Sequence, residues 1–278
     1  MTHLIIQCGS SARGDINKNS DIDIACIWSD TPPEYEKIKQ EHGDVMFYSA
    51  ETICRMRNNG SLFLTHLDLD GKYISGNRKL TALYKGFRPT PNQLNKSLIE
   101  SRAFLLTLQW FPNSTQGYLW LNDVLFICLR NIIYCENAKN SIYEFGFETA
   151  LKAFNLCESD IQAIRGIREG KYAYRKGTNK LDNPIQENEI VTVTSKISKS
   201  PINLTRGGKT NWPEKIINYW DERLIERAII NGEIKSKSYM QLIKTHNYSK
   251  ISLRKAAQDI LMKQLYLESS RTASLTDL

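Results

Sequence analysis

Two short segments decide the fold of this chain: Ile5-Ile6-Gln7-Cys8-Gly9-Ser10 and, ten residues later, Asp21-Ile22-Asp23-Ile24-Ala25-Cys26-Ile27. Each contains an apolar run of strand length, and the first run ends in a turn of small residues. Because residues i and i+2 of a strand point to one face, Asp21 and Asp23 are predicted to project together. Two adjacent carboxylates repel each other unless a cation lies between them, and Mg²⁺ suits both carboxylate and phosphate oxygens. The pattern therefore predicts a strand that carries a metal site.

The turn before the aspartates has the composition of a phosphate-binding loop. Gly9 lets the backbone approach a ligand closely because it has no Cβ. The amides from Gly9 to Ala12, at the start of a short helical turn, can form an anion-binding nest, and Ser10 and Ser11 add hydroxyl donors. A phosphate cradle beside paired aspartates is typical of metal-assisted nucleotidyl transfer.

A third acidic residue, Asp44, begins a predicted strand in Gly43-Asp44-Val45-Met46-Phe47. If this strand pairs beside the Asp23 strand, Asp44 can reach the same metals and help to activate an attacking hydroxyl. The simpler interpretation is that Asp44 only starts a strand after a turn. For Asp21 and Asp23, a solvated acidic loop would not explain why two aspartates interrupt an apolar run, since aspartate is depleted in strands.

The segments Gly9-Ser10-Ser11-Ala12-Arg13-Gly14 and Asp21-Ile22-Asp23, with Asp44, resemble the signature of the DNA polymerase β-like nucleotidyltransferase superfamily. The nearest branch is that of the minimal and aminoglycoside nucleotidyltransferases. The resemblance covers about the first third of the chain. It implies transfer of a nucleoside monophosphate, AMP being expected, from ATP or another nucleoside triphosphate, with two Mg²⁺ ions as cofactors and pyrophosphate released. It also implies that Asp21 and Asp23 hold both ions, that Asp44 holds the catalytic ion, and that the triphosphate binds Gly9, Ser10, Ser11 and Arg13.

The chain departs from this family at its start. The family usually places a helix before the first strand, whereas this chain begins only a few residues before Ile5. We expect either that the natural reading frame begins further upstream or that another element covers that face of the sheet.

The composition limits which partners and which cellular compartment are expected. A chain of 278 residues with a formal charge of +7 and a pI near 9.0 permits a nucleic-acid partner without requiring one. The six cysteines include no Cys-x-x-Cys pair, which predicts a reduced, cytoplasmic protein. No stretch is predicted to reach membrane-spanning length, so no membrane partner is expected.

The pattern along the chain predicts an α+β fold, with a small mixed-sheet nucleotidyltransferase core followed by a C-terminal helical bundle. Residues 1–88 form the predicted catalytic domain and residues 89–268 a mainly helical acceptor-binding domain. Within the latter, 181–212 is predicted to be a polar, mobile connection whose alternating segment Ile190-Val191-Thr192-Val193-Thr194 suggests a strand. Residues 269–278 are predicted to be a disordered tail.

Several charged side chains in the helical half have two interpretations. One set, at helical spacing, could bind phosphates or could form a solvated basic face, which we favour. It comprises Arg165, Arg168, Tyr172 and Arg175. On the apolar segment 118–134 and just after it, Arg130 could reach the triphosphate and Glu136 the acceptor, but internal salt bridges would explain both residues and Asp123 equally well. His66 stands alone in the sequence and is expected to be a surface or core histidine.

These residues predict a Mg²⁺-dependent nucleotidyltransferase acting on an acceptor hydroxyl. RNA or protein is the favoured acceptor, the latter as in toxin–antitoxin pairs or defence systems. The rival class is a non-catalytic nucleotide sensor or antitoxin-like module that binds the triphosphate without transfer. A small antibiotic acceptor would instead need acidic groups such as Glu100, Asp123 and Glu136, because aminoglycosides are polycations.

Overall fold

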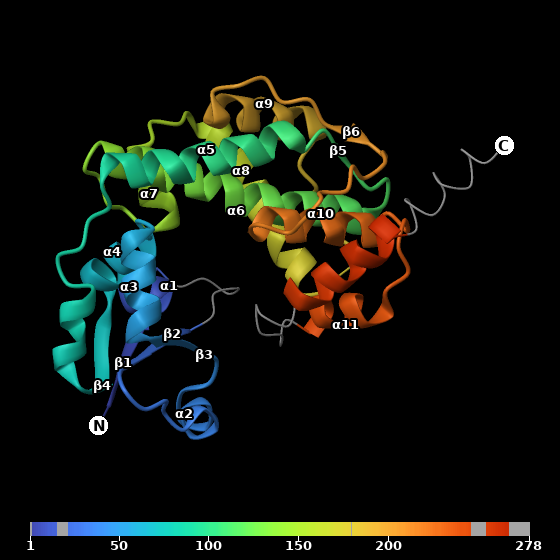
Figure 1. Cartoon of the computed structure of the whole chain (residues 1–278). Helices are drawn as coiled ribbons and strands as arrows, with labels where there is room; N and C mark the ends of the chain where they lie inside the picture. The colour runs from blue at the N-terminus through green and yellow to red at the C-terminus, as the bar shows by residue number, and fades with distance from the viewer. Residues whose placement is uncertain (1, 16–21, 179, 246–253, 267–278) are drawn as a thin grey trace. The chain divides into compact units, whose positions relative to one another are not determined.

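The computed structural model describes residues 2–15, 22–178, 180–245 and 254–266 (Figure 1). The chain divides into two compact units. Unit 1 comprises Met1–Ser101 and Arg130–Cys157, and unit 2 comprises Arg102–Leu129 and Glu158–Leu278. The unit boundaries fall inside two long helices, α5 (Pro91–Thr107) and α6 (Thr115–Lys139), so each of these helices contributes residues to both units. The predicted functional division at residue 88 stays a prediction.

Unit 1 is built on a four-stranded mixed sheet with the order β3-β2-β1-β4. Its strands are β1 (His3–Cys8), β2 (Asp23–Trp28), β3 (Val45–Ser49) and β4 (Lys72–Gly76). β1 is antiparallel to both of its neighbours, whereas β2 and β3 are parallel and are joined through α2 (Tyr35–His42). This sheet, followed mostly by helices, confirms the predicted α+β fold.

The two faces of the sheet are covered by different helices. One face packs against α3 (Ala50–Asn58), α4 (Leu62–Asp70) and the 3₁₀ helix η1 (Arg78–Leu83). The strand side chains on this face are Leu4, Ile6, Cys8, Ala25 and Ile27, and they meet Ile53, Leu64 and Leu67 of the helices. On the other face, α2 contributes Ile38, which packs against Ile5, Ile24, Cys26 and Val45. Each fully buried aliphatic side chain stabilises the fold by about 1.5–3 kcal/mol.

The remaining described elements are mainly helical. They are a short parallel pair, β5 (Trp110–Phe111) with β6 (Thr205–Arg206), and the helices α7 (Phe147–Ala153), α8 (Glu158–Arg175), α9 (Glu187–Ser198), α10 (Tyr219–Ile230) and α11 (Lys237–Thr245). Residues 254–266 form a further helical stretch. The predicted disordered tail lies outside the described residues.

The long helix α6 corrects one sequence prediction. Its 25 residues are long and apolar enough to cross a membrane by length and composition, contrary to the expectation that no stretch would be. However, 72% of its apolar window is buried inside the protein, and Leu121, Val124 and Leu125 are fully buried. A helix that is apolar all round is also what the centre of a soluble helical protein requires.

The predicted strand at residues 190–194 is also wrong, because this segment lies within helix α9. Alternating valine and threonine favours a strand locally, but the residues that become buried follow a helical period. Ile190, Val193 and Ile197 are all fully buried, at i, i+3 and i+7. Tertiary burial therefore overrides local propensity, and the connection predicted for 181–212 contains an ordered helix.

Candidate active site

The candidate site lies at one end of the unit 1 sheet. β1 ends at Cys8, which is paired in register with Asp23, the first residue of β2. β3 begins at Val45, which is paired in register with Ile24. Extending this parallel register by one residue places Asp44 beside Asp23. Asp23 thus begins β2, and Asp44 directly precedes the adjacent strand β3, whereas Asp21 lies outside the described residues.

The two aspartates share one face of the sheet. Along β2, Asp23 alternates with Ala25 and Ile27, which pack on the face covered by α3 and α4. Along β3, Met46 and Tyr48 pack on that same face, so strand alternation assigns Asp44 to it as well. Both aspartates are exposed, although β2 is mostly buried and β3 is half-buried. The sheet thus holds two acidic side chains next to each other at a solvent-facing edge.

Gly9 allows the backbone to pass close to one of these carboxylates. Its φ is +71°, in the left-handed region that favours glycine. A Cβ at this position would overlap the carboxylate of Asp23. The space that a side chain would fill is therefore occupied by the carboxylate of Asp23, which the turn approaches closely.

The turn continues into the short helix α1 (Gly9–Arg13). The carbonyl of Ser10 accepts hydrogen bonds from the backbone N–H groups of Gly14, at 2.9 Å, and Asp15, at 3.2 Å. The Ser11 hydroxyl donates to the carbonyl of Cys8 at 3.2 Å. Within the described part of the chain, the Ser10 hydroxyl has no hydrogen-bond partner. Of the two serines, Ser10 thus has the hydroxyl available to a ligand.

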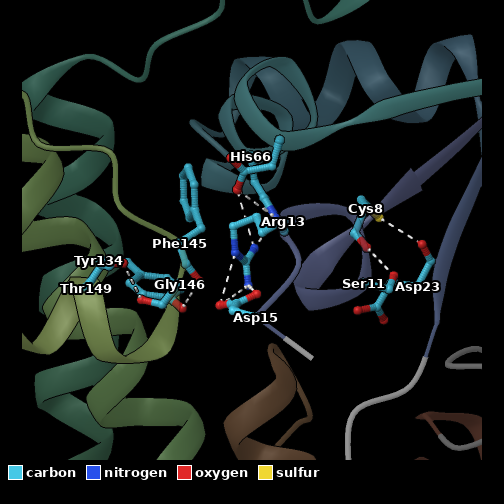
Figure 2. A network of polar contacts seen from close by, with 11 residues as sticks. Cys8, Ser11, Arg13, Asp15, Asp23, His66, Tyr134, Phe145, Gly146 and Thr149 are labelled. Atoms are coloured by element: carbon cyan, nitrogen blue, oxygen red, sulfur yellow. Dashed lines mark hydrogen bonds and ion pairs between the residues drawn. The ribbon is translucent and has the colours of Figure 1, made fainter. Parts of the chain in front are cut away.

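Arg13 is the centre of a polar network in unit 1 (Figure 2). Its Nη1 lies 2.8 Å from Nε2 of His66 and 3.3 Å from Oδ2 of Asp70, both on α4. Its Nη2 lies 3.2 Å from Oδ1 of Asp15. The His66 ring packs against Phe145, with the ring centroids 4.9 Å apart. The network ties α1 and the residues just after it to α4 and to the 145–149 segment.

Close backbone packing extends this network. A Cβ on Gly146 would lie 3.2 Å from Oδ2 of Asp15 and 2.7 Å from the Thr149 hydroxyl. Tyr134, on α6, donates to the carbonyl of Phe145 at 2.9 Å. The sequence alone did not predict this role for His66 and Asp70. The available signal was their spacing, since i and i+4 share one face of a helix.

The titratable groups around the turn have shifted pKa values. Burial, together with the nearby Asp23, raises the pKa of the Cys8 thiol to about 12. Burial, with Cys8 and Asp23 adding to it, raises the pKa of Tyr48 to about 12. Burial acts to raise the pKa of Asp70, but contacts with His66 and Arg13 outweigh burial and the net pKa is lowered. Cys8 therefore stays a neutral thiol near pH 7 and is no nucleophile, whereas Asp70 is ionised.

The donor set fits a hard divalent cation. Asp23, at the start of β2, and Asp44, directly before β3, carry carboxylate oxygens, and such oxygens are the ligands that Mg²⁺ prefers. Among the described residues, which exclude Asp21, no group of three or more histidine, cysteine, aspartate or glutamate side chains could hold a metal. The predicted contribution of Asp21 falls on a residue outside the described ones and stays a prediction.

The other predicted residues lie at varied places. Arg130 is on α6 within unit 1, with its guanidinium 6.0 Å from the ring centroid of Tyr134. Within unit 2, the buried Asp123 accepts hydrogen bonds from Arg175 at 2.8 Å and Arg223 at 2.7 Å. The internal salt-bridge interpretation of Asp123 is therefore confirmed. The contacts expected between the triphosphate and Arg13 or Arg130 stay predictions.

Comparison with known proteins identifies the N-terminal segment. Residues 4–52 match the family model described as a nucleotidyltransferase domain. The matched segment runs from β1 into α3 and includes Gly9, Ser10, Asp23 and Asp44. No curated protein matches the chain at a significant level.

Proposed function

Because residues 4–52 form a nucleotidyltransferase domain of the DNA polymerase β-like superfamily, we propose that the protein transfers AMP from ATP to an acceptor hydroxyl in a Mg²⁺-dependent reaction. The observation that carries this proposal is the juxtaposition of Asp23 and Asp44 beside Gly9. Asp23 begins β2, Asp44 directly precedes the parallel neighbour β3, and the glycine leaves room for Asp23. The favoured acceptor is RNA or protein.

Each residue has a distinct role in the proposed reaction. Asp21 and Asp23 would hold both ions, and Asp44 would hold the catalytic ion, beside the acceptor. When bound, the ions neutralise phosphate charge and lower the pKa of the attacking hydroxyl. Gly9 lets the backbone amides approach the phosphates, and the Ser10 hydroxyl donates to them. We further propose that Arg13 holds this turn in place through Asp15 and Asp70.

The transfer itself makes one bond and breaks one. The acceptor oxygen attacks the α-phosphorus of the nucleotide, and the bond between that phosphorus and the oxygen bridging to the β-phosphate breaks. Pyrophosphate leaves, and the proton of the acceptor hydroxyl passes to solvent or to a nearby carboxylate, for which Asp44 is the placed candidate.

The proposal is tested by incubating the protein with Mg²⁺, α-³²P-labelled nucleoside triphosphates and cell extract. Ribonuclease and protease digestion then assign the label to RNA, protein or small molecules. Asp23→Asn should abolish labelling, whereas the isosteric change Asp30→Asn, at an exposed residue that the site does not use, should leave it intact. Triphosphate binding by the wild-type protein without any transfer would overturn the proposal and favour a nucleotide sensor.

A further inference from the structure

The middle of unit 1 carries an unbalanced positive charge. Between Glu51 and Glu100 the chain has eight basic residues and two acidic ones, Asp68 and Asp70. Both acidic residues are already paired: Asp68 accepts from Arg88 at 2.7 Å, and Asp70 lies 3.3 Å from Arg13. This part of the sequence therefore has no remaining carboxylate to neutralise its other cations.

Most of these cations lie on or beside β4 and η1, which are shown in teal in Figure 1. We define the β4–η1 surface as six exposed residues: Arg57, Lys72, Tyr73, Arg78, Lys79 and Lys85. β4 is an edge strand of the sheet. Arg57 of α3 belongs to the surface because its Nη1 donates to the carbonyl of Leu83, the last residue of η1, at 3.0 Å.

The cations of this surface differ from those of α8. Within unit 2, Arg165 is paired with Glu158, and Arg175 is paired with Asp123. By contrast, among the described residues no carboxylate forms an ion pair with any of the five cations of the β4–η1 surface. Their charge is exposed and available to an anionic partner.

The surface also carries an aromatic ring. Tyr73 is 43% exposed, and its hydroxyl donates to the carbonyl of Gly76 at 3.1 Å. The guanidinium of Arg78 lies 4.1 Å from the centroid of the Tyr73 ring. An exposed aromatic ring among cations is the combination that binds single-stranded nucleic acid, since bases stack on the ring and phosphates meet the cations.

The surface begins at the end of the sheet that carries the candidate site. Lys72 is paired in register with Gln7, which is two residues before Gly9. A single nucleic-acid strand bound along β4 would therefore have one end close to the phosphate-binding turn at Gly9.

We propose that the β4–η1 surface binds single-stranded RNA and delivers its terminal ribose hydroxyl to the candidate site. This inference rests on the proposed nucleotidyl transfer for the use of that hydroxyl. RNA is favoured over an acidic protein because Tyr73 offers a base-stacking ring, and because the five exposed cations, on α3, β4, η1 and the residues after η1, can meet several phosphates.

The test measures binding of a short fluorescent single-stranded RNA to the full chain, without nucleotide, at several salt concentrations. The triple variant Arg78→Glu, Lys79→Glu and Lys85→Glu should weaken binding at least tenfold. It should also flatten the plot of log affinity against log salt by about 0.7 for each lost phosphate contact. A matched triple variant at exposed lysines of unit 2 removes the same charge and should leave binding unchanged: Lys209→Glu, Lys215→Glu and Lys235→Glu. Equal loss in the two variants would overturn the assignment of the surface.

The aromatic ring is tested separately. Tyr73→Ala should weaken RNA binding about tenfold, whereas Tyr73→Phe, which keeps the ring, should bind as the wild type does.

The identity of the partner is tested by other ligands. Equal affinity for the matched DNA would overturn the assignment to RNA. Loss of binding to polyglutamate rather than to RNA in the triple variant would assign the surface to an acidic protein. Self-association of that variant with unchanged RNA binding would mean that Arg78, Lys79 and Lys85 only keep copies of this chain apart by like-charge repulsion.

Failure of this proposal can be distinguished from failure of the proposed function. Asp23→Asn should bind RNA as the wild type does while losing transfer. If the wild type bound RNA through this surface but transferred no nucleotide, the surface proposal would stand and the proposed nucleotidyl transfer would be overturned. If the triple variant Arg78→Glu, Lys79→Glu and Lys85→Glu still transferred AMP to RNA, the proposed function would stand and the RNA-binding surface would be overturned.

Discussion

Two regions of the molecule treat acidic side chains in opposite ways. At the end of the unit 1 sheet, Asp23 begins β2, Asp44 directly precedes the adjacent β3, and both are exposed. In unit 2, Asp123 and Glu226 are buried, and Arg223 lies 2.7 Å from the first and 2.8 Å from the second. Tyr174 also donates a hydrogen bond to Glu226.

The two regions differ in the role of their carboxylates: the buried ones in unit 2 stabilise the fold, whereas the exposed ones in unit 1 are proposed to bind a ligand. A buried carboxylate persists only with partners that replace its lost hydration, so the unit 2 cluster has its partners within the protein. Adjacent exposed carboxylates gain nothing from each other, because like charges repel. Their placement is explained when a cation joins them. Mutations in the two regions should therefore affect different measurements.

The largest effect is expected at Asp44. Asp44→Ala should lower turnover by about 10³-fold or more while retaining much of the affinity for Mg·ATP, because the ion that accompanies the nucleotide keeps its other ligands. Thermal unfolding should be unchanged, or the variant should be slightly more stable without metal, since one repulsion is removed. Parallel losses of binding and turnover would instead place Asp44 with the nucleotide-bearing ion. Normal turnover would move the third carboxylate elsewhere, with Glu51 the first residue to examine.

Asp123 should show the reverse behaviour. Asp123→Asn leaves Arg223 without one of its buried anions and should lower the free energy of unfolding by about 3 kcal/mol. Asp182→Asn, at an exposed residue of the same unit, should cost nothing measurable. Denaturant unfolding measures both variants, and an equally small effect in both would mean that the buried pair adds no net stability.

The Asp123 contribution also depends on pH. Burial acts to raise the pKa of Asp123, but Arg223 and Arg175 outweigh it, and the folded-state pKa lies below the usual 3.8. Its stabilisation is therefore complete above that value and is lost as the pH falls through the folded-state pKa. The stability difference between the wild type and Asp123→Asn should shrink accordingly in acid.

Sequence patterns identified the sheet better than the helical half. The alternation of apolar and acidic residues from 21 to 27 located β2, and the apolar run that follows Asp44 located β3. Helix α9 was missed because alternating valine and threonine has a strand-like pattern. The burial that decides between the two interpretations depends on tertiary packing, which no local window contains.

The candidate site was partly predictable for a related reason. Asp23, Asp44 and Gly9 come from short motifs, and strand pairing alone brings them together. The contacts of Arg13 were not predictable, because His66 and Asp70 lie more than fifty residues away and their approach depends on how α4 packs on the sheet. The same limit applies to charge. In the sequence, the basic residues of α8, such as Arg165 and Arg175, look like those of the β4–η1 surface. Only the structure shows which of these cations form ion pairs with carboxylates.

An intermediate effect is expected at Gly9. Gly9→Ala and Gly14→Ala both place a side chain at positive φ, which costs about 1–2 kcal/mol each. Only the Gly9 variant also pushes against a carboxylate, that of Asp23, whereas a Cβ at Gly14 meets nothing within 4 Å. Gly9→Ala should therefore lower Mg·ATP affinity at least tenfold, as measured by calorimetry, while Gly14→Ala binds normally at similar stability. Normal nucleotide binding by Gly9→Ala would place the phosphates elsewhere.

The smallest effect is expected at Ser10, and it depends on a contrast between neighbours. The Ser10 hydroxyl has no partner among the described residues, whereas the Ser11 hydroxyl already donates to the carbonyl of Cys8. Ser10→Ala should remove one hydrogen bond to a charged phosphate, about 1.5–3 kcal/mol, and raise the KM for ATP with little change in kcat. Ser11→Ala should instead lower stability by about 1 kcal/mol and leave KM near the wild-type value. Steady-state kinetics and thermal unfolding of the two variants check this. An equal rise in KM for both variants would mean that the Ser11 hydroxyl leaves the carbonyl of Cys8 when the triphosphate binds. Both serines would then bind the triphosphate, as the sequence predicted.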